Sequence, residues 1–536
     1  MSARSASDSK ATTALVVTVG AVVAVAGYRV IKKKVEKRMA TPPFKGIPVA
    51  PDSHWLLGHM IELNANGFVK GYEKCFVDPA DENGLSSFWF LQNPSVSVLR
   101  GREVKQILIS GSFRVPIPVI NIHNKHFLGL KALTALMGKE WRVARSAVHK
   151  SFTPSALKSS QTSINQVGMT LAKSLTELIE QSTTKSIQRN VLPMMKMATF
   201  DVFGRSVLDM DFQCCERLEL SEFANAFDFL TSEYTRRIQE PWNPASLLYF
   251  IPTASNRKHA RCRKTVRSFI ADQIDQAKKR PDDVTRNKHD LLTNILKFAS
   301  ENDELSEDDV SQLLTTLLFG GYDTTSITLS YALYSLAKHP EFEKECVNEI
   351  NSVLGSDPQE LASFPGPENL PFTRSVINET LRLFPPAPTN TRTLEKPVSL
   401  CGTEIPQGTD VFIPIWSIQR DPNNYPQPND MIPERWVRKR QGSGKSKQSI
   451  WEDRPLDDTT SSEIPPANRD AFCVFSAGAR NCVGRALALQ ESVTLLAFLI
   501  RSLKFDLIES DYEIEPDLCS FVQQPKDHLP MIIRKR

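Results

Sequence analysis

The sequence predicts a mainly α-helical protein with minor β structure, placed behind one N-terminal transmembrane helix. Three observations support this class: helical periodicity dominates the chain, strand-like segments are short, and one long uncharged apolar run lies near the N-terminus. With 41% hydrophobic and 24% charged residues, the composition excludes a disordered, collagen-like or polytopic membrane protein. Nine cysteines in 536 residues are too few and too scattered for a disulfide framework.

The N-terminal segment predicts a membrane anchor. Residues 11–31 contain no acidic side chain, and this length of helix just crosses a bilayer core of about 30 Å. The basic flank KKKVEKR (32–38) follows where a signal peptide would have a cleavage site, which favours a retained anchor over a cleaved signal peptide. Positive charge on this side predicts that the body faces the cytosol. We expect residues 1–40 to form a single-pass anchor in the endoplasmic reticulum membrane; the Ser/Ala-rich start leaves the plastid envelope as the alternative.

Residues 41–536 form the body, which carries nearly equal numbers of basic and acidic side chains. This balance argues against nucleic-acid binding. Short strands are expected around 86–99 and 397–412 and from 518 onward, and the polar, turn-rich stretch 441–470 is expected to be a surface insertion. The segments with helical periodicity are residues 139–150, 161–182, 219–238, 257–280, 307–338, 340–354, 368–383 and 484–503.

The segment FSAGARNCVGR (475–485) places a cysteine in a tight loop directly before an apolar helix. Free N–H groups and the helix dipole favour a thiolate there, and a thiolate is either a nucleophile or a metal ligand. The other eight cysteines are expected to be small buried apolar side chains. Phe475, Gly478, Arg480, Cys482 and Gly484 satisfy F-x-x-G-x-R-x-C-x-G, which resembles the haem-binding loop of the cytochrome P450 superfamily. The resemblance implies that Cys482 is the axial ligand of the haem iron.

Two upstream segments match the same family in order. In NETLRLFPP, Glu379 and Arg382 lie one turn apart on a predicted helix, where their opposite charges can meet. Taken alone, this spacing is equally typical of an ion pair on the protein surface, which stabilises a fold by at most about 1 kcal/mol. The resemblance implies that Arg435 of PERW joins them in a buried network that braces the cysteine loop. It also implies that Arg392 reaches a haem propionate.

The motif GGYDTTS (320–326) lies inside a long helical pattern, although each glycine costs a helix interior about 1 kcal/mol relative to alanine. The family resemblance implies that the helix kinks over the distal haem face and leaves a groove for oxygen. Thr324 would then hold water and the activated oxygen, while Asp323 would gate proton delivery. Upstream, Trp141 and Arg145 match the W-x-x-x-R pattern that contacts haem propionates in this family.

The resemblance spans residues 41–536 and implies the cytochrome P450 fold, a helix-rich prism with small sheets. It implies a haem-thiolate monooxygenase domain that binds haem b and inserts one oxygen atom of O2 into a lipophilic small molecule. Electrons would come from NADPH through a separate flavoprotein reductase in the same membrane, with cytochrome b5 as a second candidate donor.

Two alternatives remain open at this point. One is a reductase-independent isomerase or dehydratase on the same fold, against which the intact Asp323 and Thr324 argue. The other is a haem-binding membrane protein without turnover. The apolar content of the expected specificity segments does not distinguish a sterol, fatty acid, terpenoid or xenobiotic substrate, and the sequence does not define the oligomeric state.

Overall fold

The computed structural model of the chain forms two compact units. Unit 1 is built from residues 1–99 and 393–414, and unit 2 from residues 100–392 and 415–536. The predicted membrane span 11–31 lies almost entirely outside the described residues, and within the described part no helix is both long and apolar enough to cross a bilayer. The structure describes residues 28–39, 41, 43–54, 57–65, 71, 73–110, 118–239, 248–280, 290–302, 304–354, 362–440, 448–455, 467–517 and 522–536.

Unit 1 contains the sheet strands expected around 86–99 and 397–412. Strand β1 (Leu85–Phe90) pairs antiparallel with β2 (Asn93–Val98), and β2 pairs parallel with β7 (Asp410–Ile413). A small hairpin joins β5 (Val398–Leu400) to β6 (Thr403–Ile405). The core beside the sheet is aromatic, because the rings of Phe76, Phe88 and Phe412 contact one another.

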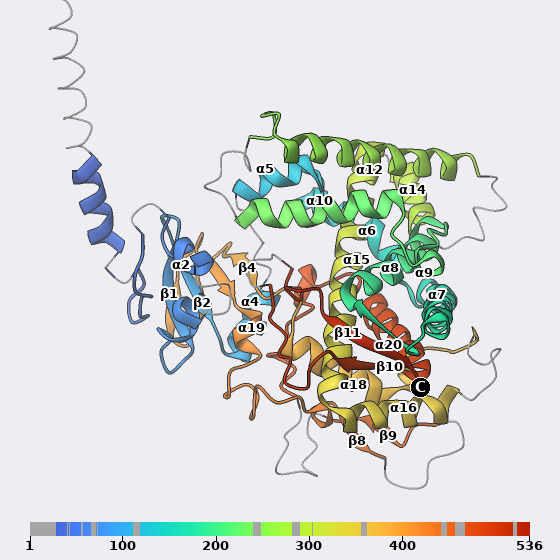
Figure 1. Cartoon of the computed structure of the whole chain (residues 1–536). Coiled ribbons are helices and arrows are strands. Elements are labelled where there is room, and N and C mark those ends of the chain that lie inside the picture. Colours follow the sequence, from blue (N-terminus) through green and yellow to red (C-terminus); the bar gives the residue numbers. More distant parts are fainter. Residues whose placement is uncertain are drawn as a thin grey trace, which may run out of the picture. The chain divides into compact units, whose positions relative to one another are not determined.

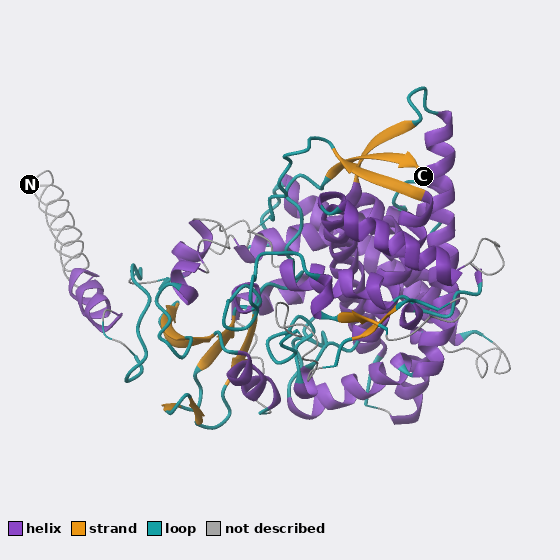
Figure 2. Ribbon diagram, turned by 90° about the horizontal axis from the view of Figure 1, so that it is seen from below, coloured by secondary structure: helices purple, strands orange, loops and turns teal. Residues whose placement is uncertain are grey.

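Unit 2 is predominantly helical and contains all eight predicted helices, so the mainly α class with minor β is confirmed (Figure 2). The helices that correspond to predictions are α6 (Gly138–His149), α7 (Pro154–Gln181), α10 (Glu222–Gln239), α12 (Ala254–Lys278), α15 (Glu307–Lys338), α16 (Pro340–Leu354), α18 (Pro371–Leu383) and α20 (Arg485–Ser502). Four helices of nine or more residues were not predicted: α4 (Gly101–Ile109), α5 (Pro118–His126), α8 (Val191–Phe203) and α14 (Leu291–Asn302).

Helix α15 is the central element of unit 2. It begins at a capping box, in which the Asp309 N–H donates to the Ser306 hydroxyl and the Ser306 N–H donates to the Asp309 carboxylate. One hydrophobic core packs α15 with α7, α8, α18 and α20, and a second packs it with α6, α10, α12 and α14. Figure 1 shows α10 and α12 side by side across one end of the helical unit.

The remaining strands of unit 2 form two small sheets. Strand β11 (Pro530–Lys535) pairs antiparallel with both β10 (Leu503–Leu507) and β3 (Ser186–Asn190). Strand β8 (Val437–Lys439) pairs with β9 (Trp451–Asp453), which lies in the expected insertion 441–470. Of that stretch the structure describes 448–455 and 467–470, where Trp451 is buried and its indole donates to Glu345. This part of the segment therefore packs into the body.

Candidate functional site

Cys482 lies in the loop before α20 and lines a cavity of about 380 Å³. Its N–H donates to the Phe475 carbonyl at 2.8 Å, which closes the loop around the thiol. Burial raises the pKa of the Cys482 thiol, while the Gly484 N–H and the charges of Arg145 and Arg485 oppose that rise. The thiol therefore opens on a cavity whose amide and guanidinium groups favour its anionic form.

Glycine is required at one position of this loop. Gly478 has a φ of +68°, and a Cβ added there would lie 2.4 Å from the Leu108 carbonyl oxygen. The close approach of the loop to α4 leaves no room for a side chain.

Three arginines line the same cavity from separate elements. Arg145 of α6 donates to the backbone and side-chain oxygens of Asn481, at 2.9 and 2.6 Å. Arg392, at the end of β4 (Asn390–Thr393), is buried and donates to the Ser476 hydroxyl at 3.0 Å.

Arg480 is the third of these arginines. Its guanidinium carbon lies 4.0 Å from the ring centroid of Trp141, and it donates to the Leu136 carbonyl. The indole and guanidinium of W-x-x-x-R therefore lie at the same cavity wall as the cysteine loop. Trp141, Arg145, Arg392 and Arg480 line the same cavity as Cys482.

Helix α15 supplies another wall of the cavity through Gly320, Gly321 and Thr324. A Cβ added at Gly320 would meet no heavy atom within 4 Å, so the glycine leaves open space on the helix surface. The chain stays helical through both glycines, and the Thr324 hydroxyl donates to the Gly320 carbonyl at 2.6 Å. Such side-chain bonds to the preceding turn often bend a helix.

Asp323 does not line the cavity; its carboxylate is buried on another side of α15. Its Oδ1 lies 3.5 Å from Lys196 Nζ, and Lys196 also pairs with Asp228 at 2.6 Å. Burial raises the pKa of Asp323 despite the lysine charge. Burial opposes the charged form of Lys196, but the two carboxylates outweigh it and raise the lysine pKa. Tyr322 donates to Asp228 and completes the cluster.

Glu379, Arg382 and Arg435 form a buried ionic network. Glu379 Oε1 accepts from Arg382 at 2.8 Å and from Arg435 at 3.2 Å, and Oε2 accepts from the Trp436 indole at 2.8 Å. Arg382 and Arg435 donate further to backbone carbonyls of the 419–430 segment. The network joins α18 to the chain that leads into the cysteine loop.

The donor set of the cavity suits an anionic cofactor that carries a metal with an affinity for sulfur. A thiolate is a soft ligand, and arginine is suited to carboxylate groups. The one acidic residue among the described lining residues is Glu491, whose burial raises the pKa of its carboxyl well above the ordinary value. Elsewhere in the described residues, no cluster of three His, Cys, Asp or Glu side chains could hold a metal ion.

Sequence reasoning missed Lys196, Asp228 and Glu491. Lys196 is the one basic residue in the largely apolar segment VLPMMKMATFDVF, and a charge in a mostly apolar helix is a signal for a buried ion pair. Glu491 carries a comparable signal, because it is the one acidic residue of the apolar helix α20. Asp228 carries none, because α10 is of ordinary polarity.

Comparisons with known proteins agree with this geometry. The family model for cytochrome P450 matches residues 48–530. The leukotriene-B4 omega-hydroxylase 3 of Mus musculus is 27% identical over 488 residues, which cover 87% of this chain and 86% of that protein. Cytochrome P450 4V2 of Homo sapiens is 24% identical over 477 residues, covering 85% of this chain and 83% of that protein. Cytochrome P450 4c3 of Drosophila melanogaster is 24% identical over 508 residues, which cover 90% of this chain and 88% of that protein. The chain belongs to the cytochrome P450 family and is a cytochrome P450 monooxygenase.

Proposed function

We propose that Cys482 is the axial ligand of a haem b iron and that the enzyme inserts one oxygen atom of O2 into a lipophilic substrate. One observation carries this proposal: the Cys482 thiol and the Gly320–Thr324 turn of α15 line a single cavity. When bound, a haem with a cysteine thiolate ligand supplies the activation of dioxygen. The protein supplies binding, orientation, exclusion of water and protons.

The arginines around the loop would hold the cofactor's carboxylates. Arg145, Arg392 and Arg480 present guanidinium groups that suit paired hydrogen bonds to carboxylate oxygens. Hydrogen bonds hold two of these guanidiniums at the cavity wall: Arg145 donates to the Asn481 side chain, and Arg392 donates to the Ser476 hydroxyl. Trp141 supports Arg480 by a cation–π contact and adds an apolar face to the wall.

Protons would reach the site along α15. Asp228, whose side chain is 30% exposed, connects solvent to Lys196, and Lys196 connects to the buried Asp323 carboxyl. Because burial raises its pKa, the Asp323 carboxyl is able to take up a proton at its Oδ1 or Oδ2. Thr324, the next residue, presents its hydroxyl to the cavity from the other side of α15, and we propose that it takes part in the same proton delivery.

The substrate is expected to be lipophilic, and electrons to come from outside the chain. Leu133, Phe203 and Val207 contribute apolar surface to the cavity. One relative is named for the omega-hydroxylation of leukotriene B4.

We propose that the electrons come from a separate NADPH-dependent flavoprotein reductase. We also propose that the enzyme lies in the endoplasmic reticulum membrane, held there by the anchor 1–40.

The test is the absorbance change when carbon monoxide is added to the dithionite-reduced protein. We expect the strongly red-shifted Soret band of a haem-thiolate in the wild type and in Cys401→Ala, which alters an exposed cysteine of unit 1. Cys482→Ala should lack the band while retaining its far-UV circular dichroism. A wild-type protein that folds with haem supplied and still lacks the band would refute the assignment of Cys482.

A further inference from the structure

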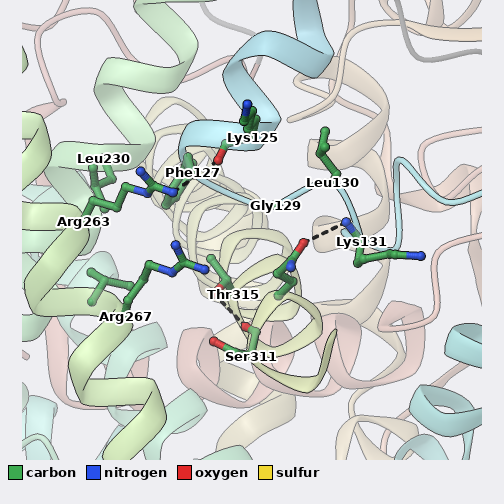
Figure 3. A pocket seen from close by; sticks show the side chains of 12 residues that line it. Lys125, Phe127, Gly129, Leu130, Lys131, Leu230, Arg263, Arg267, Ser311 and Thr315 are labelled. Carbon is green, nitrogen blue, oxygen red and sulfur yellow. Dashed lines mark hydrogen bonds between the residues drawn. The ribbon is translucent and has the colours of Figure 1, made fainter. Parts of the chain in front are cut away.

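A pocket of about 180 Å³ lies between the 125–131 segment, α10, α12 and α15 (Figure 3). Figure 3 shows Arg263 and Arg267 reaching toward it from α12, with the 125–131 segment across from them. Lys125 and Lys131 also line it. We call this cavity the basic pocket, because four of its lining side chains are cationic.

The charges at the basic pocket do not balance. Two of the four cations have counter-charges: Arg267 lies 3.0 Å from Asp308, and Lys131 lies 2.7 Å from Glu140. The other two cations pair with no carboxylate among the residues that the structure describes. Four cations against two carboxylates leave an excess of two positive charges at the wall of the pocket.

Arg263 and Arg267 lie one helical turn apart on the same face of α12. Like charges at this spacing destabilise a helix. Burial lowers the pKa of the Arg263 guanidinium, and the charge of Arg267 lowers it further. Within the described residues, Arg263 donates to the Lys125 carbonyl at a long 3.4 Å. A bound anion between the two guanidiniums would therefore relieve their repulsion and accept hydrogen bonds that the protein does not use.

Helix α15 adds one available hydroxyl to the basic pocket. The Thr315 hydroxyl donates to the Ser311 carbonyl at 2.8 Å, and the Gln312 amide donates to Asp308 at 2.5 Å. The hydroxyl of Ser311 has no hydrogen-bond partner in the described part of the chain, and Ser311 lines the pocket. Two guanidiniums of α12 and one hydroxyl of α15 can therefore donate to the same ligand.

The charge excess indicates the class of ligand. A phosphate monoester carries about −1.5 to −2 charge at pH 7 and has three strong acceptor oxygens, which match two positive charges and donors on two helices. A phosphate diester carries a single charge and would leave half of the excess uncompensated. Phe127, Leu230 and Val266 add apolar surface beside the cations, which suits the organic part of an ester.

We propose that the basic pocket binds the phosphate of a phosphate monoester, held by Arg263 and Arg267 of α12 and by the Ser311 hydroxyl of α15. The monoester is either a soluble compound or the head group of a membrane lipid. Among the described residues, the basic pocket has no lining residue in common with the Cys482 cavity. The site is therefore separate from that cavity, and the proposal does not depend on the proposed monooxygenase function.

The test is equilibrium dialysis of the full-length protein at pH 7 with three radiolabelled probes. Dihexanoyl phosphatidate is a lipid monoester, dihexanoyl phosphatidylmethanol is its singly charged diester, and glycerol 3-phosphate is a soluble monoester. We expect wild type to bind phosphatidate at least tenfold more tightly than phosphatidylmethanol. Arg263→Ala should weaken phosphatidate binding by about tenfold, the effect of losing one charge-assisted hydrogen bond. Arg267→Ala should weaken it by a smaller factor, because Asp308 already offsets that charge.

Arg261→Ala is the matched control, since it removes an exposed cation of α12 that does not line the pocket, and it should leave binding within about twofold of wild type. Arg263→Lys keeps the charge and should lose less than Arg263→Ala. If Arg263→Ala does not fold, Arg263→Gln gives the same comparison with a longer side chain. Far-UV circular dichroism checks that each variant is folded.

Two outcomes would overturn the proposal. One is equal wild-type affinity for phosphatidate and phosphatidylmethanol, which would show that the second charge is not recognised. The other is an Arg263→Ala variant that binds phosphatidate as tightly as Arg261→Ala does. If the proposal holds, the third probe identifies the source of the phosphate. Glycerol 3-phosphate that binds as tightly as phosphatidate supports a soluble ester, and binding about tenfold weaker or more supports a lipid head group.

Discussion

Glu379→Gln tests how strongly the buried ionic network stabilises the fold. The glutamate is fully buried, and its charge offsets the guanidiniums of Arg382 and Arg435, which are also buried. Glutamine keeps the shape and an acceptor oxygen but leaves two buried cations without a counter-charge. Breaking a buried ion pair in this way costs about 3–5 kcal/mol. Glu379→Ala should cost more, because the Ile432 N–H and the Trp436 indole also lose their acceptor, at about 1–3 kcal/mol each.

The assay is the urea midpoint from intrinsic tryptophan fluorescence, with the carbon monoxide band measured in parallel. The control is Glu452→Ala, which breaks the partly exposed pair with Arg438 and should cost less than about 1 kcal/mol. If Glu379→Gln lies within about 1 kcal/mol of wild type, the reasoning that an uncompensated buried charge dominates is refuted. A further check is to replace all three charged residues by apolar ones, which should recover part of the stability that Glu379→Ala loses.

Three further changes test other parts of the structure. Gly478→Ala forces an alanine into a left-handed conformation against a backbone oxygen. We therefore expect the free energy of unfolding to fall by about 2 kcal/mol or more, and the purified protein to contain less haem. A haem content equal to that of wild type would contradict this. Burial, with nearby arginine charge, lowers the pKa of both His123 and His259 to about 4, below the unfolded value of about 6.5. Both are then neutral in the folded state, so stability should fall as pH decreases from about 6.5 toward 4, and urea midpoints of His123→Gln should show a shallower fall than wild type. Lys196→Met removes the counter-charge of Asp323, and adding Asp323→Asn should restore part of the lost stability. In a double-mutant cycle, we expect a coupling free energy of about 1–3 kcal/mol between the two positions. Strictly additive losses of stability would disprove the pairing.

Local signals were sufficient for much of the helical framework. Helix α15 begins and ends at the predicted residues, because Ser306 and Asp309 form a capping box and His339-Pro340 separates it from α16. Helix α8 was missed for an identifiable reason. Nearly all of its residues are buried, so its apolar residues surround the helix and show no periodic pattern.

The sequence motifs alone were sufficient to identify the resemblance to the cytochrome P450 family and the loop that contains Cys482, because each motif is a run of residues close together in the chain. The side chains expected beside that loop follow from this resemblance and not from a local pattern. Tertiary structure alone decided that Lys196 pairs with Asp323, 127 positions away, and that Asp323 points away from the cavity that Thr324 lines. Such pairings depend on how the helices pack against one another, and packing is a property of the whole core that no local pattern in the sequence encodes.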